Sequence, residues 1–253
     1  MTKFDEPRTD LNDKTVFVTG GTGSFGRAFV RTVLENYRPR KLIVFSRDEL
    51  KQFEMQQDAA FRGQDCLRFF IGDVRDVDRL EMAMRDVDCV IHAAAMKQIA
   101  AAEYNPFECV RTNIHGAENI ATAAIRTGVQ QVIALSTDKA VNPVNLYGAS
   151  KLASDKIFVA ANNLSGDSGT RFSVVRYGNV LGSRGSVLPL FLKLRDEGAD
   201  HLPDRKSVVE GKRVDLGGRR IIKKNSHLIA NQAHTHHTHS PQTPQHAPPS
   251  PSP

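Results

Sequence analysis

The stretch TVFVTGGTGSFG, residues 15–26, decides the fold of this chain. A short run rich in β-branched residues leads directly into the glycines, and an amphipathic segment follows them. A lone GxGxxG pattern is a weak signal, but between a first strand and a first helix it is typical of a dinucleotide-binding loop. Gly20 permits the tight turn, Gly23 lets backbone amides approach a pyrophosphate, and Gly26 allows helix and strand to pack closely. The residues expected to bind the dinucleotide here are Gly20, Thr22, Gly23, Ser24, Phe25 and Gly26.

The chain alternates strand-like runs with amphipathic stretches as far as Pro203. The expected strands are Thr15–Thr19, Lys41–Phe45, Leu67–Ile71, Cys89–His92, Gln131–Leu135 and Phe172–Val175. The expected helices include Phe25–Tyr37, Asp48–Phe61, Pro106–Thr127 and Tyr147–Asn163. This order predicts an α/β fold with a doubly wound parallel sheet of the Rossmann type.

The formal net charge of the 253 residues is +6, and most of it lies near the C-terminal end. Residues 1–203 carry 26 basic and 25 acidic side chains, whereas residues 204–253 carry 8 and 3. The folded part therefore gives no reason to expect nucleic-acid binding. No apolar run approaches the roughly 18 residues of a membrane helix, and no signal-peptide pattern precedes the first strand. With three cysteines that lack metal spacing, we expect a cytoplasmic protein with reduced thiols and no metal.

The regular pattern stops at Pro203, so residues 1–203 are expected to form the binding and catalytic domain. Six of the nine histidines and six of the twelve prolines follow Ser226, a composition that predicts disorder. The segment from Asp204 resembles a translated sequencing-library adapter. Our hypothesis is that residues 204–253 are a non-native tail.

The end of the second strand indicates which dinucleotide binds. An NAD site usually places a carboxylate there to accept from the ribose 2′-hydroxyl. Here Ser46 and Arg47 occupy that place, and Lys51 follows one helical turn later. These donors suit a 2′-phosphate, so NADP is the expected cofactor. The alternative is that Arg47 is a solvated charge and that Asp48 binds the ribose.

Two further segments follow strands at the same expected edge of the sheet. Asp73-Val74 comes after the third strand, where an acidic side chain commonly meets the adenine amine. Ala93-Ala94-Ala95 comes after the fourth, where small side chains let the backbone lie against the cofactor.

Tyr147 and Lys151 lie four residues apart and so share one face of a helix. An ammonium beside a phenol lowers the pKa of the tyrosine, and the same lysine can reach the nicotinamide ribose. A Tyr-x-x-x-Lys pair is common by chance, but here it follows a Rossmann loop and the strand end at Leu135-Ser136-Thr137. We therefore expect a catalytic pair.

With these motifs the chain resembles an extended short-chain dehydrogenase/reductase of the polysaccharide biosynthesis protein family. It is more similar still to the inverting UDP-N-acetylglucosamine 4,6-dehydratases that begin pseudaminic acid biosynthesis. The resemblance spans roughly residues 12–203. It rests on Thr19–Gly26, Phe45–Met55 (FSRDELKQFEM), Gly72–Asp76 (GDVRD), His92–Lys97 (HAAAMK), Ala102–Pro106, Thr112–Gly116 (TNIHG), Ala134–Ala140 (ALSTDKA), Asn142–Lys151 (NPVNLYGASK) and Arg176–Val187 (RYGNVLGSRGSV).

Within the resemblance, Thr137-Asp138-Lys139 is the discriminating segment. Reductases and 4-epimerases lack an acid–base pair here, retaining dehydratases typically show Asp-Glu, and Asp-Lys resembles the inverting kind. The implied chemistry begins with Tyr147 taking the proton of the sugar 4-hydroxyl while carbon 4 gives hydride to NADP⁺. A neutral Lys139 then removes the carbon 5 proton and a protonated Asp138 assists loss of the 6-hydroxyl. Hydride returns to carbon 6, and carbon 5 is reprotonated from the opposite face.

The resemblance also implies contacts outside this core. Lys97 would bind cofactor or sugar, and Asn179 with Val187, Leu188, Pro189, Leu190 and Phe191 would contact the UDP-sugar. Relatives form homo-oligomers through the helices at about 106–127 and 147–163. They also continue past a Leu-Pro like Leu202-Pro203, where this chain departs from the pattern.

Two alternatives stay open. One is a sugar-nucleotide 4-epimerase or reductase on the same fold, in which Asp138-Lys139 is incidental. The other is an inactive NADP-binding fragment, which would bind cofactor and form no product.

Overall fold

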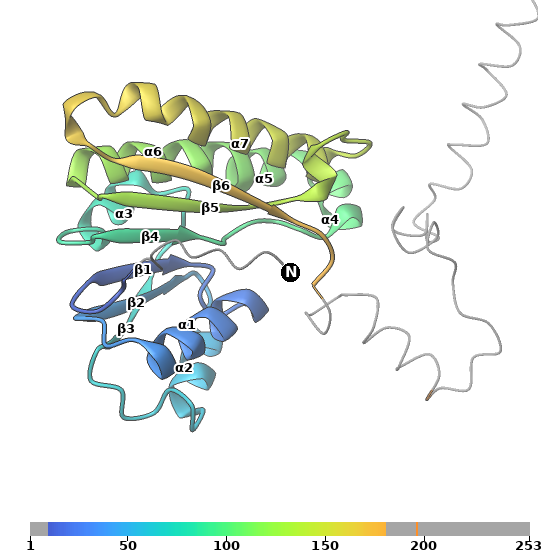
Figure 1. The fold of residues 1–253 in the computed structure, drawn as a ribbon. Coiled ribbons are helices and arrows are strands. Elements are labelled where there is room, and N and C mark those ends of the chain that lie inside the picture. Colours follow the sequence, from blue (N-terminus) through green and yellow to red (C-terminus); the bar gives the residue numbers. More distant parts are fainter. Residues whose placement is uncertain (1–9, 181–195, 197–253) are drawn as a thin grey trace, which may run out of the picture. The chain divides into compact units, whose positions relative to one another are not determined.

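One six-stranded sheet organises the part of the computed structural model that is described, residues 10–180 and Asp196. All neighbouring strands pair in parallel, in the order β3-β2-β1-β4-β5-β6 (Figure 1). The prediction of a doubly wound parallel sheet of the Rossmann type is confirmed. The chain order reverses between β1 and β4, the place where such sheets bind ligands beyond the carboxyl ends of their strands.

The strands are β1 (Thr15–Thr19), β2 (Lys41–Ser46), β3 (Leu67–Ile71), β4 (Cys89–His92), β5 (Gln131–Thr137) and β6 (Arg171–Tyr177). The α-helices are α1 (Ser24–Asn36), α2 (Glu49–Gln57), α3 (Val77–Ala83), α4 (Ile99–Tyr104), α5 (Pro106–Val110), α6 (Gly116–Thr127) and α7 (Leu146–Leu164). A π-helical turn, Arg111–His115, joins α5 to α6, and 3₁₀ turns lie at Asp138–Ala140 and Gly166–Ser168. None of the described helices has the length and apolar character needed to cross a membrane.

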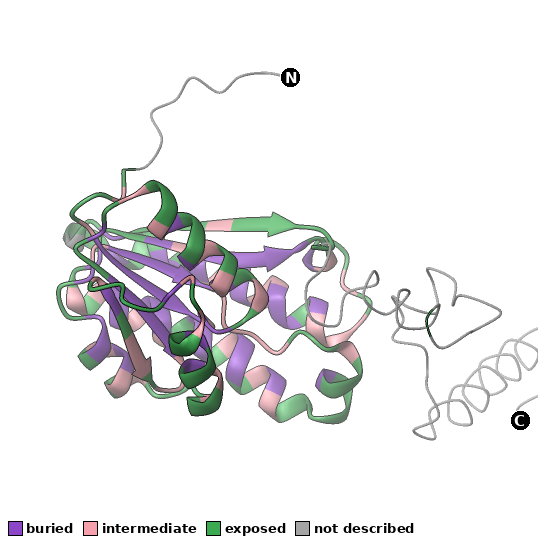
Figure 2. Ribbon diagram, turned by 90° about the horizontal axis from the view of Figure 1, so that it is seen from below, coloured by how far each residue is buried: buried purple, intermediate pink, exposed green. Residues whose placement is uncertain are grey.

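Alternating side chains of the strands build a separate core on each face of the sheet. Phe17, Ile43 and Phe45 pack with residues of α3, α6 and α7 on one face. Val16, Val18, Leu42 and Val44 pack with residues of α1 and α2 on the other. The central strands are therefore buried on both sides, and exposed residues gather on the outer faces of the helices (Figure 2). This two-sided burial explains why the strands read as nearly continuous apolar runs.

The predicted strands agree with the structure to within two residues, and the helices differ more. The helix expected at Asp48–Phe61 ends at Gln57, and two short helices, α3 and α4, were not predicted. The helix expected over Pro106–Thr127 has the predicted ends, and a π-helical turn that was not predicted lies within it at Arg111–His115. Asn113 lies within that turn and bonds outside the helix, to both backbone polar groups of Met96. Such tertiary bonds give the sequence no periodic signal.

Gly26 is where α1 and the glycine loop touch. A Cβ at Gly26 would lie 2.4 Å from the Cα and the carbonyl oxygen of Gly21. These are backbone atoms of a tight turn and have little room to move.

We therefore expect Gly26→Ala to lower the free energy of unfolding by about 2 kcal/mol, measured by urea denaturation. Alanine is intrinsically the better helix former by about 1 kcal/mol. A net loss of stability in Gly26→Ala can therefore be assigned to the steric clash of the new Cβ. Ala28→Ser, on the exposed side of the same helix, should change stability by less than about 0.5 kcal/mol. A Gly26→Ala variant as stable as the unmodified chain would contradict the close approach.

Candidate active site at the carboxyl edge of the sheet

One hydroxyl joins the end of β1 to the segment after β4. Thr19 Oγ1 accepts from the backbone N–H groups of Ala93 at 3.1 Å and Ala94 at 3.2 Å, and lies 2.9 Å from Nδ1 of His92. Because two N–H groups occupy its lone pairs, its hydrogen points to Nδ1, so His92 is the Nε2–H tautomer. Burial, and then the nearby charge of Lys151, lower the pKa of His92 to about 3. The imidazole is therefore neutral.

The glycine loop has the shape that a pyrophosphate requires. Gly20 has a φ of +65°, and a Cβ there would lie 2.9 Å from the backbone nitrogen of Ala94. Gly23 is the N-cap of α1 and has no side chain to bond the first amides of the helix. These amides are thus available to an anion at the positive helix end. Thr22 is buried in the loop, Ser24 begins α1, and Phe25 is partly exposed and stacks on Phe29.

The donors expected to bind a 2′-phosphate lie after β2 in two different settings. Ser46 Oγ accepts from Gln52 Nε2 at 3.0 Å. The side chain of Arg47 is 56% exposed and reaches Asp73 Oδ2 at 3.4 Å. Asp73 and Arg47, which were predicted separately, thus meet at the ends of β3 and β2.

Lys51 was expected to donate to a 2′-phosphate, but its ammonium is paired at the N-terminus of its own helix. Its ammonium pairs with the carboxylate of Asp48, which also caps α2 by accepting from the backbone N–H of Lys51 at 3.0 Å. These bonds lower the pKa of Asp48. The reason is local, since Asp48 at the N-cap brings the two side chains within one helical turn. The Asp48 carboxylate is therefore already engaged.

Tyr147 lies near the start of α7 and is half-buried. Burial is the largest influence on its pKa and raises it, while a hydrogen bond with Thr137 acts in the opposite direction. The expectation that Lys151 lowers the pKa of Tyr147 is wrong for this geometry. Lys151 is directed instead to β5, where its Nζ donates to the carbonyl oxygen of Leu135 at 2.7 Å.

Lys151 is buried, and this burial lowers its pKa to about 8. Asp155, one turn further along α7, opposes the shift. The Asp155 carboxylate is itself buried and accepts from Nε of Arg176, on β6, at 2.8 Å. Lys151 thus lies near an ion pair that crosses from α7 to β6 and is buried at Asp155 but part-exposed at Arg176.

Asp138 and Lys139 form an ion pair in the 3₁₀ turn after β5. Lys139 Nζ lies 3.1 Å from Asp138 Oδ1 and 3.2 Å from Asn179 Oδ1, and the Thr137 hydroxyl donates to the same Asp138 oxygen at 3.0 Å. Burial raises the pKa of Asp138, but the bonds from Lys139 and Thr137 outweigh it and the net shift is downward. Asp138 is therefore an anion at neutral pH.

Gly148 fixes this turn against α7. A Cβ on Gly148 would lie 2.5 Å from the carbonyl oxygen of Lys139, so only glycine allows the contact. Because Gly148 follows Tyr147 directly, the acid–base pair and the tyrosine are held side by side.

Two residues that the sequence analysis did not single out belong to this region. Asn113 Nδ2 donates to Ser150 Oγ at 2.9 Å and so connects the π-helical turn to α7. Tyr177, at the end of β6, is close enough to influence the pKa of Tyr147, and burial raises its own pKa. The quoted motif RYGN contained Tyr177, but nothing in the pattern separated it from its neighbours.

The remaining predicted residues are placed as follows. Val74 accepts from Asn119 Nδ2 at 3.0 Å, Ala93–Ala95 are half-buried after β4, and Lys97 is exposed just before α4. Ser136 is buried in β5 beside Thr137. Val187–Phe191 and residues 204–253 lie outside the described residues. Within residues 10–180, no three His, Cys, Asp or Glu side chains gather as a metal would require.

Comparison with known proteins places this architecture among sugar-nucleotide enzymes. The family model described as "Polysaccharide biosynthesis protein" matches residues 16–203. A UDP-N-acetylglucosamine 4,6-dehydratase (inverting) of Campylobacter jejuni is 64% identical over 193 residues, which are 76% of this chain and 57% of that protein. A UDP-glucose 4-epimerase of Rickettsia akari is 44% identical over 191 residues, 74% of this chain and 55% of that protein. The chain thus spans little more than half the length of these relatives.

Two solved structures have a similar fold. Pen from Bacillus thuringiensis has a TM-score of 0.71 at 44% identity, over 75% of this chain and 58% of that one. DesIV from Streptomyces venezuelae, a dTDP-glucose 4,6-dehydratase solved with NAD bound, has a TM-score of 0.62 at 25% identity, over 73% and 62%.

The pKa of Lys151, lowered from 10.5 to about 8, has a consequence for stability. Between these values the unfolded chain binds a proton that the folded chain does not, so the free energy of unfolding rises with pH, by up to about 3 kcal/mol. Cys89, whose pKa burial raises from 9.0 to about 11, acts in the opposite direction above pH 9, so the rise is best seen from pH 7 to 9. Urea unfolding over this range should show the rise in the unmodified chain and not in Lys151→Met. Lys156→Met, the same change at an exposed position of α7, should keep it. Equal pH profiles for Lys151→Met and the unmodified chain would rule out the buried titration.

Proposed function

The chain belongs to the polysaccharide biosynthesis protein family, and on that premise we propose that it is an NADP-dependent inverting UDP-GlcNAc 4,6-dehydratase, a lyase. The product is a UDP-2-acetamido-2,6-dideoxy-4-hexulose, a precursor of pseudaminic acid for surface glycans. The observation that carries the proposal is the Lys139 ammonium held between Asp138 and Asn179 beside Tyr147. A reductase or an epimerase has no use for a second acid–base pair at this position.

The cofactor assignment rests on the glycine loop and the end of β2. The uncapped amides of α1 can bind a pyrophosphate, and the close approach of Gly20 to Ala94 holds the loop beside the end of β4, which supports a nicotinamide dinucleotide. Arg47 favours NADP over NAD, because its exposed guanidinium can bind a 2′-phosphate through two donors. Asp48, the acceptor of the alternative NAD reading, is occupied by Lys51 and by the cap of α2.

The first step belongs to Tyr147 and Lys151. Tyr147 accepts the proton of the sugar 4-hydroxyl, for which it must first be a phenolate. A Thr137 hydroxyl that turns its hydrogen from Asp138 to the phenol oxygen would favour that form, against the burial that raises the pKa of Tyr147. Lys151 supplies positive charge at neutral pH from the base of the site, with its ammonium fixed on Leu135. When bound, the nicotinamide accepts hydride from carbon 4 and later returns hydride to carbon 6.

The elimination of water uses the Asp138–Lys139 pair. A proton that moves from Lys139 Nζ to Asp138 Oδ1, 3.1 Å away, makes one group a neutral base and the other a neutral acid. Excluding water favours this neutral form, since desolvation disfavours two charges. Lys139 then takes the carbon 5 proton while Asp138 protonates the departing 6-hydroxyl. The step forms a carbon 5–carbon 6 double bond, releases water and restores the resting ion pair.

The cellular setting is part of the same proposal. UDP-sugars are formed from UTP, which the cytoplasm supplies, so we place the protein there. We also propose a homo-oligomer through the helices at residues 106–127 and 147–163. Phe107 and Val159 support this, because both are large apolar side chains exposed on α5 and α7.

The test is to incubate the full chain with UDP-GlcNAc and substoichiometric NADP⁺ in D₂O and to follow the product by NMR. We expect a 4-keto-6-deoxy sugar that carries deuterium at carbon 5 and is inverted there. Tyr147→Phe should lower turnover by roughly 10²–10⁴-fold, and Lys139→Met should abolish dehydration. Lys156→Met, which removes an exposed ammonium from α7, should leave turnover unchanged.

Other outcomes point to specific alternatives. Retention at carbon 5 would move the chain to the retaining branch. A carbon 4 epimer with an intact 6-hydroxyl would make it an epimerase. Cofactor binding without product, with activity restored by adding the C-terminal part of a relative, would make it an NADP-binding fragment.

A further inference from the structure

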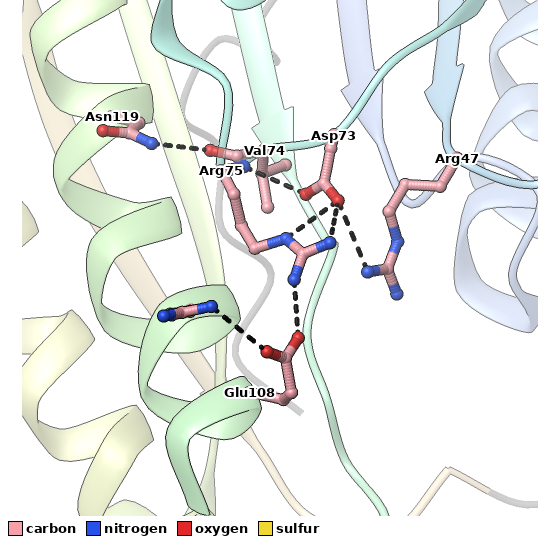
Figure 3. A network of polar contacts seen from close by, with 7 residues as sticks. Arg47, Asp73, Val74, Arg75, Glu108 and Asn119 are labelled. Atoms are coloured by element: carbon pink, nitrogen blue, oxygen red, sulfur yellow. Dashed lines mark hydrogen bonds and ion pairs between the residues drawn. The ribbon is translucent and has the colours of Figure 1, made fainter. Parts of the chain in front are cut away.

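Asp73 lies between two arginines that approach the same carboxylate oxygen from different sides (Figure 3). Arg75 donates to Asp73 Oδ2 through Nε at 2.9 Å and through Nη2 at 2.7 Å, and its backbone N–H bonds Oδ1 at 3.0 Å. Arg47 contacts Oδ2 through Nη1 at 3.4 Å. Arg75 is therefore the closer and stronger partner of this carboxylate.

Arg75 is also anchored at its far end. Its Nη1 lies 2.6 Å from Glu108 on α5, and Glu108 in turn pairs with Arg111 at 3.5 Å. Arg47 has no second anchor in the part of the chain that the structure describes: its one ion pair there is with Asp73, and its side chain is 56% exposed. One arginine is thus immobilised and the other can turn away.

The charges of this group explain why the difference matters. Three arginines meet two carboxylates, so the group carries one positive charge in excess. If Arg47 turns toward an incoming anion, Asp73 remains neutralised by Arg75. Without Arg75, the departure of Arg47 would leave a partly buried carboxylate unpaired, which is unfavourable. The hydrogen bond from Arg75 is also the largest influence that lowers the pKa of Asp73 against its burial.

We propose that Arg75, held by Glu108, is a specificity-determining residue: by neutralising Asp73 it releases Arg47 to bind the 2′-phosphate of NADP. This inference rests on the NADP-dependent function proposed above. Arg75 need not contact the cofactor itself. It acts through the charge of Asp73, so its effect concerns the choice between NADP and NAD and not dinucleotide binding in general.

The test is the ratio of NAD to NADP dissociation constants, measured by calorimetry on the full chain without substrate. Arg75→Gln leaves Arg47 as the one cation of the group that contacts Asp73 and should lower the ratio about fivefold, the size expected for a half-exposed ion pair. Asp73→Asn added to Arg75→Gln should restore the ratio, although both affinities fall. Arg75→Lys keeps a cation beside Asp73 and should retain most of the preference. Arg75→Lys also tests the inference if Arg75→Gln does not fold.

Arg79→Gln is the matched control, because it removes a nearby guanidinium that donates to the Ile71 carbonyl and lies over Phe70. Its ratio should equal that of the unmodified chain. An Arg75→Gln ratio equal to that of the unmodified chain, or an equal fall in Arg79→Gln, would overturn the inference and leave the proposed function intact. Preference of the unmodified chain for NAD would overturn the NADP assignment and this inference together.

Discussion

A parallel sheet brings the carboxyl end of every strand to the same edge, and the candidate site depends on this constraint. Residues that are far apart in the sequence become neighbours there, although no long-range pattern in the sequence predicts that they meet. The segments that follow the strands in this way are Gly20–Gly26, Ser46–Asp48, Asp73–Arg75, Ala93–Lys97, Asp138–Lys139 and Gly178–Asn179. The two apolar cores hold the strands in register, so the positions of these segments are set by packing and not by the polar groups themselves.

The ion pair between the buried Asp155 and the part-exposed Arg176 joins the two parts of the proposed chemistry. Asp155 lies on α7 with Tyr147 and Lys151, and Arg176 lies on β6, three residues before the Asn179 that contacts Lys139. A shift of β6 that moved Asn179 would therefore also pull the Arg176 guanidinium away from the buried Asp155 carboxylate. Loss of Arg176 would leave the buried Asp155 carboxylate without its ion-pair partner, which is unfavourable, so the pair opposes such a shift. Gly148 acts in the same direction by steric contact.

The sequence predicted the sheet well because burial on both faces leaves uninterrupted apolar runs, such as Val16–Val18. It also predicted the glycine loop, because the φ of +65° at Gly20 and the close approach of Gly26 to Gly21 both require glycine. It failed for α3 and α4, which have seven and six residues and too few turns for a helical period to show. The π-helical turn and the pairing of Lys51 with Asp48 depend on side-chain bonds formed only in the folded chain. For the same reason, spacing alone could not reveal that Lys151 bonds Leu135 and that burial raises the pKa of Tyr147.

The Thr19–His92 contact has a consequence for how the site responds to its surroundings. Histidine ordinarily changes charge near neutrality and so serves as a proton sensor in many proteins. Here the imidazole lies in the core with its hydrogen-bond acceptor occupied by Thr19, and it stays neutral far below the pH range of living cells. The electric field that this ring contributes at the junction of β1 and β4 is thus constant. Acidification of its surroundings would therefore leave this junction electrically unchanged.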